Sequence, residues 1–181
     1  AAKKYQELDG KVDAFGVGGA DLGVLVDKKW YPLFSVNPMV RFVKETPLVD
    51  GTGLKTNLES KSASFLDAHI KDYINERGRK AFIMTGADRW GLTQCFLDAG
   101  YECVFGDLMF SLGIPIPLRS AKQLKSMAAL FMPIAGRLPF AWVYPTGEKQ
   151  EERKPKHTDL FQWATVTAGD CHYIKRYMPE D

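Results

Sequence analysis

The feature that most constrains the fold lies between residues 80 and 105. Lys80–Thr85 carries four consecutive apolar residues, which is typical of a strand buried on both faces of a parallel sheet. A glycine-bounded turn, Gly86–Gly91, leads into a predicted helix over Leu92–Ala99, and Gly100 precedes a second strand over Tyr101–Phe105. Two strands joined by such a helix form a right-handed βαβ unit with parallel strands. We therefore predict an α/β fold: a Rossmann-like three-layer parallel sheet flanked by helices.

Other segments are predicted to add strands and helices around this unit. Short runs of β-forming residues predict a hairpin of Val24–Val26 with Trp30–Phe34, a short buried strand Pro47–Val49 and a final strand Ala164–Ala168. Apolar spacing predicts one long helix over Lys55–Arg77 that Gly78 ends. A further helix is predicted to be capped by Ser120 and to end before Pro133.

Four residues directly follow predicted parallel strands. They are Asp50, Gly86, Asp107 and Gly169. Ligands of α/β proteins bind at the carboxyl ends of the strands, so we expect these four residues to gather along one edge of the sheet.

Length and composition fit a single domain and exclude several classes of partner. The chain has 181 residues, of which 45% are hydrophobic and 25% charged, as in ordinary globular domains. Its net charge of +2 gives no electrostatic basis for nucleic-acid binding. Its longest apolar stretches contain prolines and are shorter than the roughly 20 residues of a membrane span. We predict a small-molecule partner, no nucleic acid and no membrane, and we leave homo-oligomerisation open.

The cysteines and the chain ends indicate the cellular context. Cys95, Cys103 and Cys171 lack CxxC spacing and are too few for a disulfide framework, which predicts a cytoplasmic protein. The sequence has no initiator methionine and stops shortly after a helix predicted from Tyr173. We therefore expect residues 1–181 to be a single domain from a longer chain. Residues 146–157 carry nearly balanced charges and are predicted to form a charged loop or hinge.

The turn after the first strand of the βαβ unit has the spacing of a dinucleotide-binding turn. Such turns read Gly-x-Gly-x-x-Gly, with an acid about 20 residues further on for the ribose hydroxyls. Gly86 and Gly91 hold the outer positions, and Asp107 follows 21 residues after Gly86. Asp88 replaces the middle glycine and would oppose a pyrophosphate, while Arg89 would offset part of that charge. These five residues are the candidate site for NAD or NADP.

Two of these residues also have a purely structural interpretation. Asp88 could cap the following helix, a position that suits aspartate and the helix dipole. Asp107 could be a turn residue at the end of a strand. The sequence leaves both alternatives open.

A second polar segment, Asp50–Asn57, lies between a predicted strand and the predicted long helix. Backbone N–H groups at such a helix start can hold an anion or a hydroxyl, and Thr52 is a candidate substrate-binding residue. Asp50 and Lys55 are candidate catalytic residues that would transfer protons on a polar substrate. The alternative is a glycine-rich helix start that Thr52 or Thr56 caps.

A third segment, Gly169–Tyr173, follows the last predicted strand. His172 could be a general base oriented by Asp170, or it could activate Cys171 as a nucleophile. Asp170 and His172 are therefore candidate substrate-binding residues. Because adjacent residues rarely face each other, the alternative is a helix cap by Asp170 beside a half-buried His172. The other two histidines lie in separate segments, so we predict no metal site.

Five segments of the chain carry a family resemblance. They are Val12–Asp21, Thr46–Lys55, Gly106–Arg119, Tyr144–Gln150 and Ala168–Pro179. In these segments the chain resembles a bacterial family whose members are labelled quinate 5-dehydrogenase or shikimate-dehydrogenase-like. The resemblance implies NAD(P)-dependent oxidation of a ring hydroxyl of quinate or shikimate, and a parent chain that extends further at both ends.

The shikimate dehydrogenases carry the motif Asn-x-Thr-x-Pro-x-Lys with a catalytic lysine. Thr52-Gly53-Leu54-Lys55 is similar to it and implies Lys55 as that lysine, although the proline is absent and the lysine falls one place early. The chain has no Asn-Thr-Asp motif, and Asp88 stands at the second loop glycine.

From these observations we predict an NAD(P)-dependent oxidoreductase acting on a quinate-like or shikimate-like polyhydroxy carboxylate. One alternative is a non-catalytic Rossmann-like ligand-binding or regulatory module that has lost the dinucleotide turn. Another is a Rossmann-like enzyme that uses a different nucleotide, such as a methyltransferase.

Overall fold

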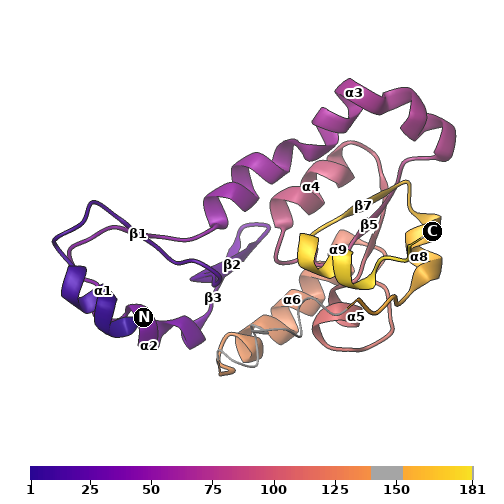
Figure 1. The fold of residues 1–181 in the computed structure, drawn as a ribbon. Helices are drawn as coiled ribbons and strands as arrows, with labels where there is room; N and C mark the ends of the chain where they lie inside the picture. The colour runs from indigo at the N-terminus through magenta and orange to yellow at the C-terminus, as the bar shows by residue number, and fades with distance from the viewer. Residues whose placement is uncertain (140–152, 181) are drawn as a thin grey trace.

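The computed structural model describes residues 1–139 and 153–180 and shows a mixed α/β structure with small sheets (Figure 1). The helices are α1 (Ala2–Leu8), α2 (Asn37–Val40), α3 (Ser62–Arg77), α4 (Trp90–Asp98), α5 (Asp107–Ser111), α6 (Ala121–Ala135), α8 (Thr158–Trp163) and α9 (Cys171–Tyr177). The strands are β1 (Phe15–Gly16), β2 (Gly23–Val26), β3 (Lys29–Pro32), β4 (Leu48–Val49), β5 (Lys80–Ile83), β6 (Glu102–Phe105) and β7 (Val166–Ala168).

The βαβ unit predicted from the sequence is confirmed. Strands β5 and β6 pair in parallel, with Lys80 opposite Glu102 and Ile83 opposite Phe105, and α4 connects them. Strand β7 pairs in parallel with the other side of β5, so the sheet order is β6-β5-β7. The chain thus leaves β5 for one neighbouring strand and later returns to its opposite side.

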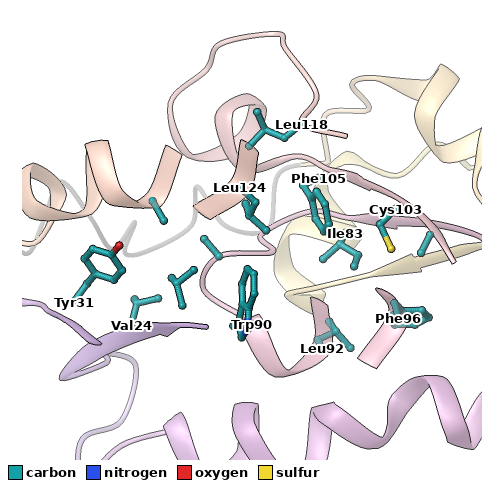
Figure 2. Packing of buried hydrophobic residues seen from close by; sticks show 14 of the residues in the cluster. Val24, Tyr31, Ile83, Trp90, Leu92, Phe96, Cys103, Phe105, Leu118 and Leu124 are labelled. Carbon is teal, nitrogen blue, oxygen red and sulfur yellow. The ribbon is translucent and has the colours of Figure 1, made fainter. Parts of the chain in front are cut away.

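Side chains along β5 alternate between two hydrophobic clusters, one on each face of this sheet. Ala81 and Ile83 belong to the larger cluster, together with Phe96 of α4 and residues of α3, α6 and the β2–β3 hairpin (Figure 2). Phe82 and Met84, which directly follows β5, belong to the smaller cluster, and residues of α5, α8 and α9 complete it. The apolar run in the sequence reflects this burial on both faces.

The N-terminal part of the chain, with α1, β1, α2 and β4, lies apart from the three-stranded sheet (Figure 1). The hairpin of β2 and β3 forms as predicted, but β4 pairs with β1 instead of joining the main sheet. A strand does form within the predicted segment Pro47–Val49, but the prediction that it is buried is wrong, since Val49 is 56% exposed. Asp50 consequently follows a strand of a different sheet from the one whose strands precede Gly86, Asp107 and Gly169. A run of three residues does not specify which sheet it enters.

The predicted helix over Lys55–Arg77 is helical but not regular. It begins as a π-helical turn, η2 (Leu54–Leu58), continues as a 3-10 turn, η3 (Glu59–Lys61), and then becomes α3. Within α3, Ile70 has a non-helical φ of −139°. Gly78 ends the helix with a φ of +84°, a conformation that favours glycine.

Helix α6 begins as predicted and ends later than predicted. Its cap is confirmed, because the Ser120 hydroxyl accepts a hydrogen bond from the Gln123 N–H at 3.2 Å. The helix runs to Ala135 and includes Pro133. A proline this close to a helix end removes one hydrogen bond without stopping the last turn. Helices α5 and α8 were not predicted, because five and six residues are too few to show a helical period.

Part of the predicted charged loop, 146–152, lies outside the described residues, and 153–157 form neither helix nor strand. Among the residues that the structure describes, no helix combines the length and apolar character needed to cross a membrane.

Phe96 fixes α4 on the sheet, since it is 1% exposed and packs edge-on against Tyr101 with ring centroids 4.9 Å apart. We predict that Phe96→Ala lowers the free energy of unfolding by about 3–5 kcal/mol, and that Phe96→Leu lowers it less. Leu130→Ala, at a side chain that is 65% exposed, should change it by less than about 0.5 kcal/mol. Urea denaturation followed by circular dichroism measures all three. Equal losses for Phe96→Ala and Leu130→Ala would contradict this packing.

Candidate functional site

Lys55, Asp21 and Asp88 form a cluster of ion pairs, which we call the Lys55 cluster. The Lys55 Nζ donates to Asp21 Oδ2 at 2.9 Å and to both carboxylate oxygens of Asp88 at 2.8 and 2.9 Å. Lys55 lies in η2, Asp21 precedes β2, and Asp88 lies in the turn between β5 and α4. The Lys55 and Asp21 side chains are 16% and 17% exposed, and that of Asp88 is 36% exposed. The cluster therefore links three segments that are distant in the sequence.

Gly91 allows the backbone of α4 to approach η2 closely enough for this pairing. A Cβ atom at Gly91 would lie 2.4 Å from the backbone carbonyl oxygen of Lys55. Such a contact with backbone cannot be relieved by rotating a side chain, so the position requires glycine. Gly91, which the sequence analysis predicted to hold a nucleotide, thus allows α4 and η2 to pack closely in this structure.

The charges of the cluster set the protonation of its members. Burial alone would lower the pKa of Lys55, but the charges of Asp88 and Asp21 and their hydrogen bonds outweigh burial and raise it above 10.5. Burial raises the pKa of Asp21 above 3.8, and the Lys55 charge only partly opposes this. Lys55 is therefore an ammonium group near neutral pH and not a free base.

A cavity of about 300 Å³ opens beside the cluster. Its walls combine charged, hydroxyl and apolar side chains, which include Val24, Thr52, Lys55, Asp88, Trp90 and Asp98. This volume is at the lower end of the range for small-molecule sites, roughly 300–1,000 Å³. The cavity can therefore hold a small molecule that has both polar and apolar surface.

Asp50 has different partners from those predicted. Its carboxylate accepts hydrogen bonds from the Leu22 N–H at 2.7 Å and the Thr52 N–H at 2.9 Å. Burial would raise the pKa of Asp50, but these donors outweigh it and lower the pKa below 3.8. Asp50 thus fixes the start of the hairpin against the loop before η2, and Asp21 and Asp88 are the hydrogen-bonded partners of Lys55. A catalytic role for Asp50 remains a prediction.

Thr52 lines the cavity, which agrees with a position for substrate binding, and that role remains a prediction. The alternative of a threonine cap is wrong. The residue at the N-cap position of η2 is Gly53, and no side chain forms a capping hydrogen bond with η2. Instead, the Thr56 hydroxyl donates to the Thr52 carbonyl at 2.9 Å, within the helical segment.

Asp107 occupies the part of the turn where a pyrophosphate was predicted. Its carboxylate accepts from the Gly86 N–H at 2.9 Å and from the Ala87 N–H at 2.8 Å, and the residue is 4% exposed. Burial raises the pKa of Asp107 to about 7, although these two N–H groups act in the opposite direction. The N–H groups that would bind a phosphate thus already hold a carboxyl group.

Asp88 is not a helix cap, contrary to the alternative interpretation. The residue before α4 is Arg89, no side-chain cap is formed, and Asp88 pairs with Lys55 instead. Arg89, predicted to offset a phosphate charge, donates to Glu59 and, at 2.9 Å, to Asp170. In this arrangement the N–H groups of Gly86 and Ala87 and the guanidinium of Arg89 are bound to carboxyl groups of the chain, so a dinucleotide would have to displace these partners.

Asp170 caps α9, as the structural alternative predicted. Its Oδ1 accepts from the His172 N–H at 2.8 Å, and its Oδ2 accepts from Arg89. His172 is exposed and not half-buried. The potential ligand atoms of Asp170, Cys171 and His172 lie within 4.8 Å of one another. A metal ion there would share the Asp170 carboxylate with two hydrogen-bond donors and would face the positive charge of Arg89.

The sequence analysis did not identify Asp21 or Glu59. Asp21 stands in a glycine-rich loop and Glu59 in a helical segment rich in charged and polar residues, so neither has a local pattern that marks a site. Both acquire their roles through partners that lie 34 and 30 residues away.

Comparison with known families divides the chain at the loop before Lys55. The family model DUF8754, a domain of unknown function, matches residues 53–181, and DUF8753, also a domain of unknown function, matches residues 1–50. No curated protein and no solved structure matches the chain. The Lys55 cluster takes Asp21 from one matched segment and Lys55 and Asp88 from the other.

The stability of this cluster can be tested with Lys55→Met. We predict that it lowers the free energy of unfolding by about 3 kcal/mol near neutral pH, because two carboxylates lose their counter-charge. The loss should become smaller as the pH is lowered from neutral, since Asp21, whose pKa burial already raises, then takes up a proton more readily than an ordinary aspartate. Lys125→Met, which breaks an exposed pair with Asp27, is the control, with an expected loss below about 0.5 kcal/mol. Urea denaturation measures both, and a loss no larger than that of the control would contradict the predicted role.

The raised pKa of Asp107 predicts a pH dependence of stability. Between about pH 4 and pH 7 the folded chain holds a proton on Asp107 that the unfolded chain has lost, so stability falls as pH rises through this window. In Asp107→Asn this dependence is absent, and the free energy of unfolding should fall less between about pH 5 and pH 7. Urea titrations across this range measure the two slopes. Parallel profiles for the wild type and the variant would show that Asp107 does not titrate there.

Proposed function

This chain belongs to the DUF8754 family of domains of unknown function, and we propose that it binds a small hydroxyl-rich molecule in the cavity beside the Lys55 cluster. The proposal rests on Lys55 and Asp88, which line the cavity while hydrogen bonds fix their positions. Polar groups that are fixed before binding can orient a ligand without a further loss of side-chain freedom. Ligand hydroxyls would donate charge-assisted hydrogen bonds to the carboxylates.

The same groups could transfer a proton. Because Lys55 is an ammonium group near neutral pH, it would not act as a base or as a Schiff-base nucleophile. Two carboxylates on the cavity wall, Asp88 and Asp98, can accept a hydroxyl proton, and Lys55 would hold that of Asp88 in position. In this proposal Asp88 takes the role that the sequence analysis gave to Asp50.

The NAD(P)-dependent oxidoreductase is the second candidate. Strand order reverses at β5, which is where α/β proteins bind ligands, and this order also supports a Rossmann-like three-layer fold. A dinucleotide in the turn would first have to displace the Asp107 carboxyl group from Gly86 and Ala87. For this reason we place ligand binding first, in agreement with the alternative of a module that has lost the dinucleotide turn.

A cytoplasmic location and a small-molecule partner, without nucleic acid or membrane, are part of the proposal. Cys95, Cys103 and Cys171 are free thiols, which supports a reducing compartment.

Isothermal titration calorimetry with a panel of cyclic polyols, both uncharged and carboxylated, tests the binding function. We expect wild-type protein to bind at least one of them with a Kd below about 1 mM. Lys55→Met should weaken this binding about tenfold or more, because Asp88 loses the group that orients it, whereas Lys125→Met should bind like the wild type. Trp90 is 9% exposed at the cavity wall, so the ligand should also change the fluorescence of the protein, and Trp90→Phe should remove this change.

Two outcomes would decide against this order of candidates. If no polyol of the panel binds the wild type, the binding function is wrong. If the wild type binds NAD or NADP and oxidises quinate or shikimate, the oxidoreductase is the better assignment.

Asp107→Ala, which frees the N–H groups of the turn, should bind either nucleotide more tightly than the wild type does.

A further inference from the structure

Lys55 is already paired with two carboxylates within the cluster. Its Nζ contacts one oxygen of Asp21 and both oxygens of Asp88, at distances of 2.8 to 2.9 Å. A carboxylate ligand that entered the cavity would have to compete with these two carboxylates for the ammonium group. Lys55 is therefore poorly placed to attract an anion.

The charges on the cavity wall also oppose an anion. The charged residues that line the cavity are Lys55, Asp88 and Asp98. With both carboxylates ionised, one positive charge stands against two negative ones, and Asp21 adds another negative charge behind Lys55. Arg89, the cation of the neighbouring turn, is bound to Glu59 and Asp170 and does not line this cavity.

The remaining groups of the wall suit an uncharged ligand with hydroxyls. Asp98 accepts one hydrogen bond, from the Gln94 amide at 2.7 Å, and an ionised carboxylate can accept several. Gln94 itself and the hydroxyl of Thr52 are uncharged donors on the same wall. Val24 and Trp90 supply an apolar surface against which the carbon face of a ring can pack.

From these groups we infer that the cavity selects an uncharged polyhydroxylated ring and disfavours the carboxylated form of the same ring. The inference rests on the proposed binding function and narrows it to a ligand class. It differs from the polyhydroxy carboxylate that the family resemblance implies, because a negative ligand would meet a wall with a net negative charge and no unpaired ammonium group.

The test compares two ligands that differ only in this charge, quinate and its uncharged amide, by calorimetry near neutral pH. Wild-type protein should bind the amide about tenfold more tightly than quinate. Asp98→Asn removes one negative charge from the wall and should reduce this ratio severalfold. Asp72→Asn, at an exposed side chain of α3, is the matched control and should leave the ratio unchanged. Added salt should also reduce the ratio, since it screens the repulsion.

The possible outcomes separate the inference from the function beneath it. Equal or tighter binding of quinate overturns the inference and leaves the binding function intact. A ratio that Asp98→Asn does not change also overturns it, because the selectivity would then not arise from this wall. Myo-inositol, an uncharged polyhydroxylated ring with a different pattern of substituents, serves as a third ligand. If quinate, its amide and myo-inositol all fail to bind the wild type, the proposed function itself is wrong.

Discussion

Lys55 places one ammonium group between two carboxylates that come from different parts of the chain. Asp21 stands before the hairpin and Asp88 in the turn of the βαβ unit, while Lys55 itself lies in the π-helical turn. A partly buried charge is unfavourable alone, and pairing offsets this only while all three segments keep their positions. The cavity depends on the same arrangement, since its walls combine residues of β2, of α4 and of the η2 and η3 turns.

The parts of the fold that could be predicted from the sequence are those with local information. The run from Lys80 to Thr85 and the helix-length connection after it specify a parallel pair, whatever the rest of the chain does. The cap at Ser120, the cap at Asp170 and the helix end at Gly78 are likewise determined by one residue and its immediate neighbours.

The parts that could not be predicted depend on partners far away in the sequence. Asp88 has a good position for a helix cap, but Lys55, 33 residues away, binds it instead. Asp107 lies 21 residues after Gly86, the spacing of an acid that binds a ribose, yet the same geometry lets its carboxylate bind the Gly86 N–H directly. A spacing shows that two groups can meet at one place, but it does not show whether a ligand lies between them.

The two family segments meet at this site, and neither contains it alone. Residues 1–50 supply Asp21 and Val24, and residues 53–181 supply Lys55, Asp88 and Trp90. A ligand that contacts residues of both segments would bind only while the two segments are packed against each other. Its binding would therefore stabilise that packing. The two carboxylates that keep Lys55 in place also contribute to the negative charge in and around the cavity. The interaction that joins the segments and the preference for an uncharged ligand consequently have the same physical origin.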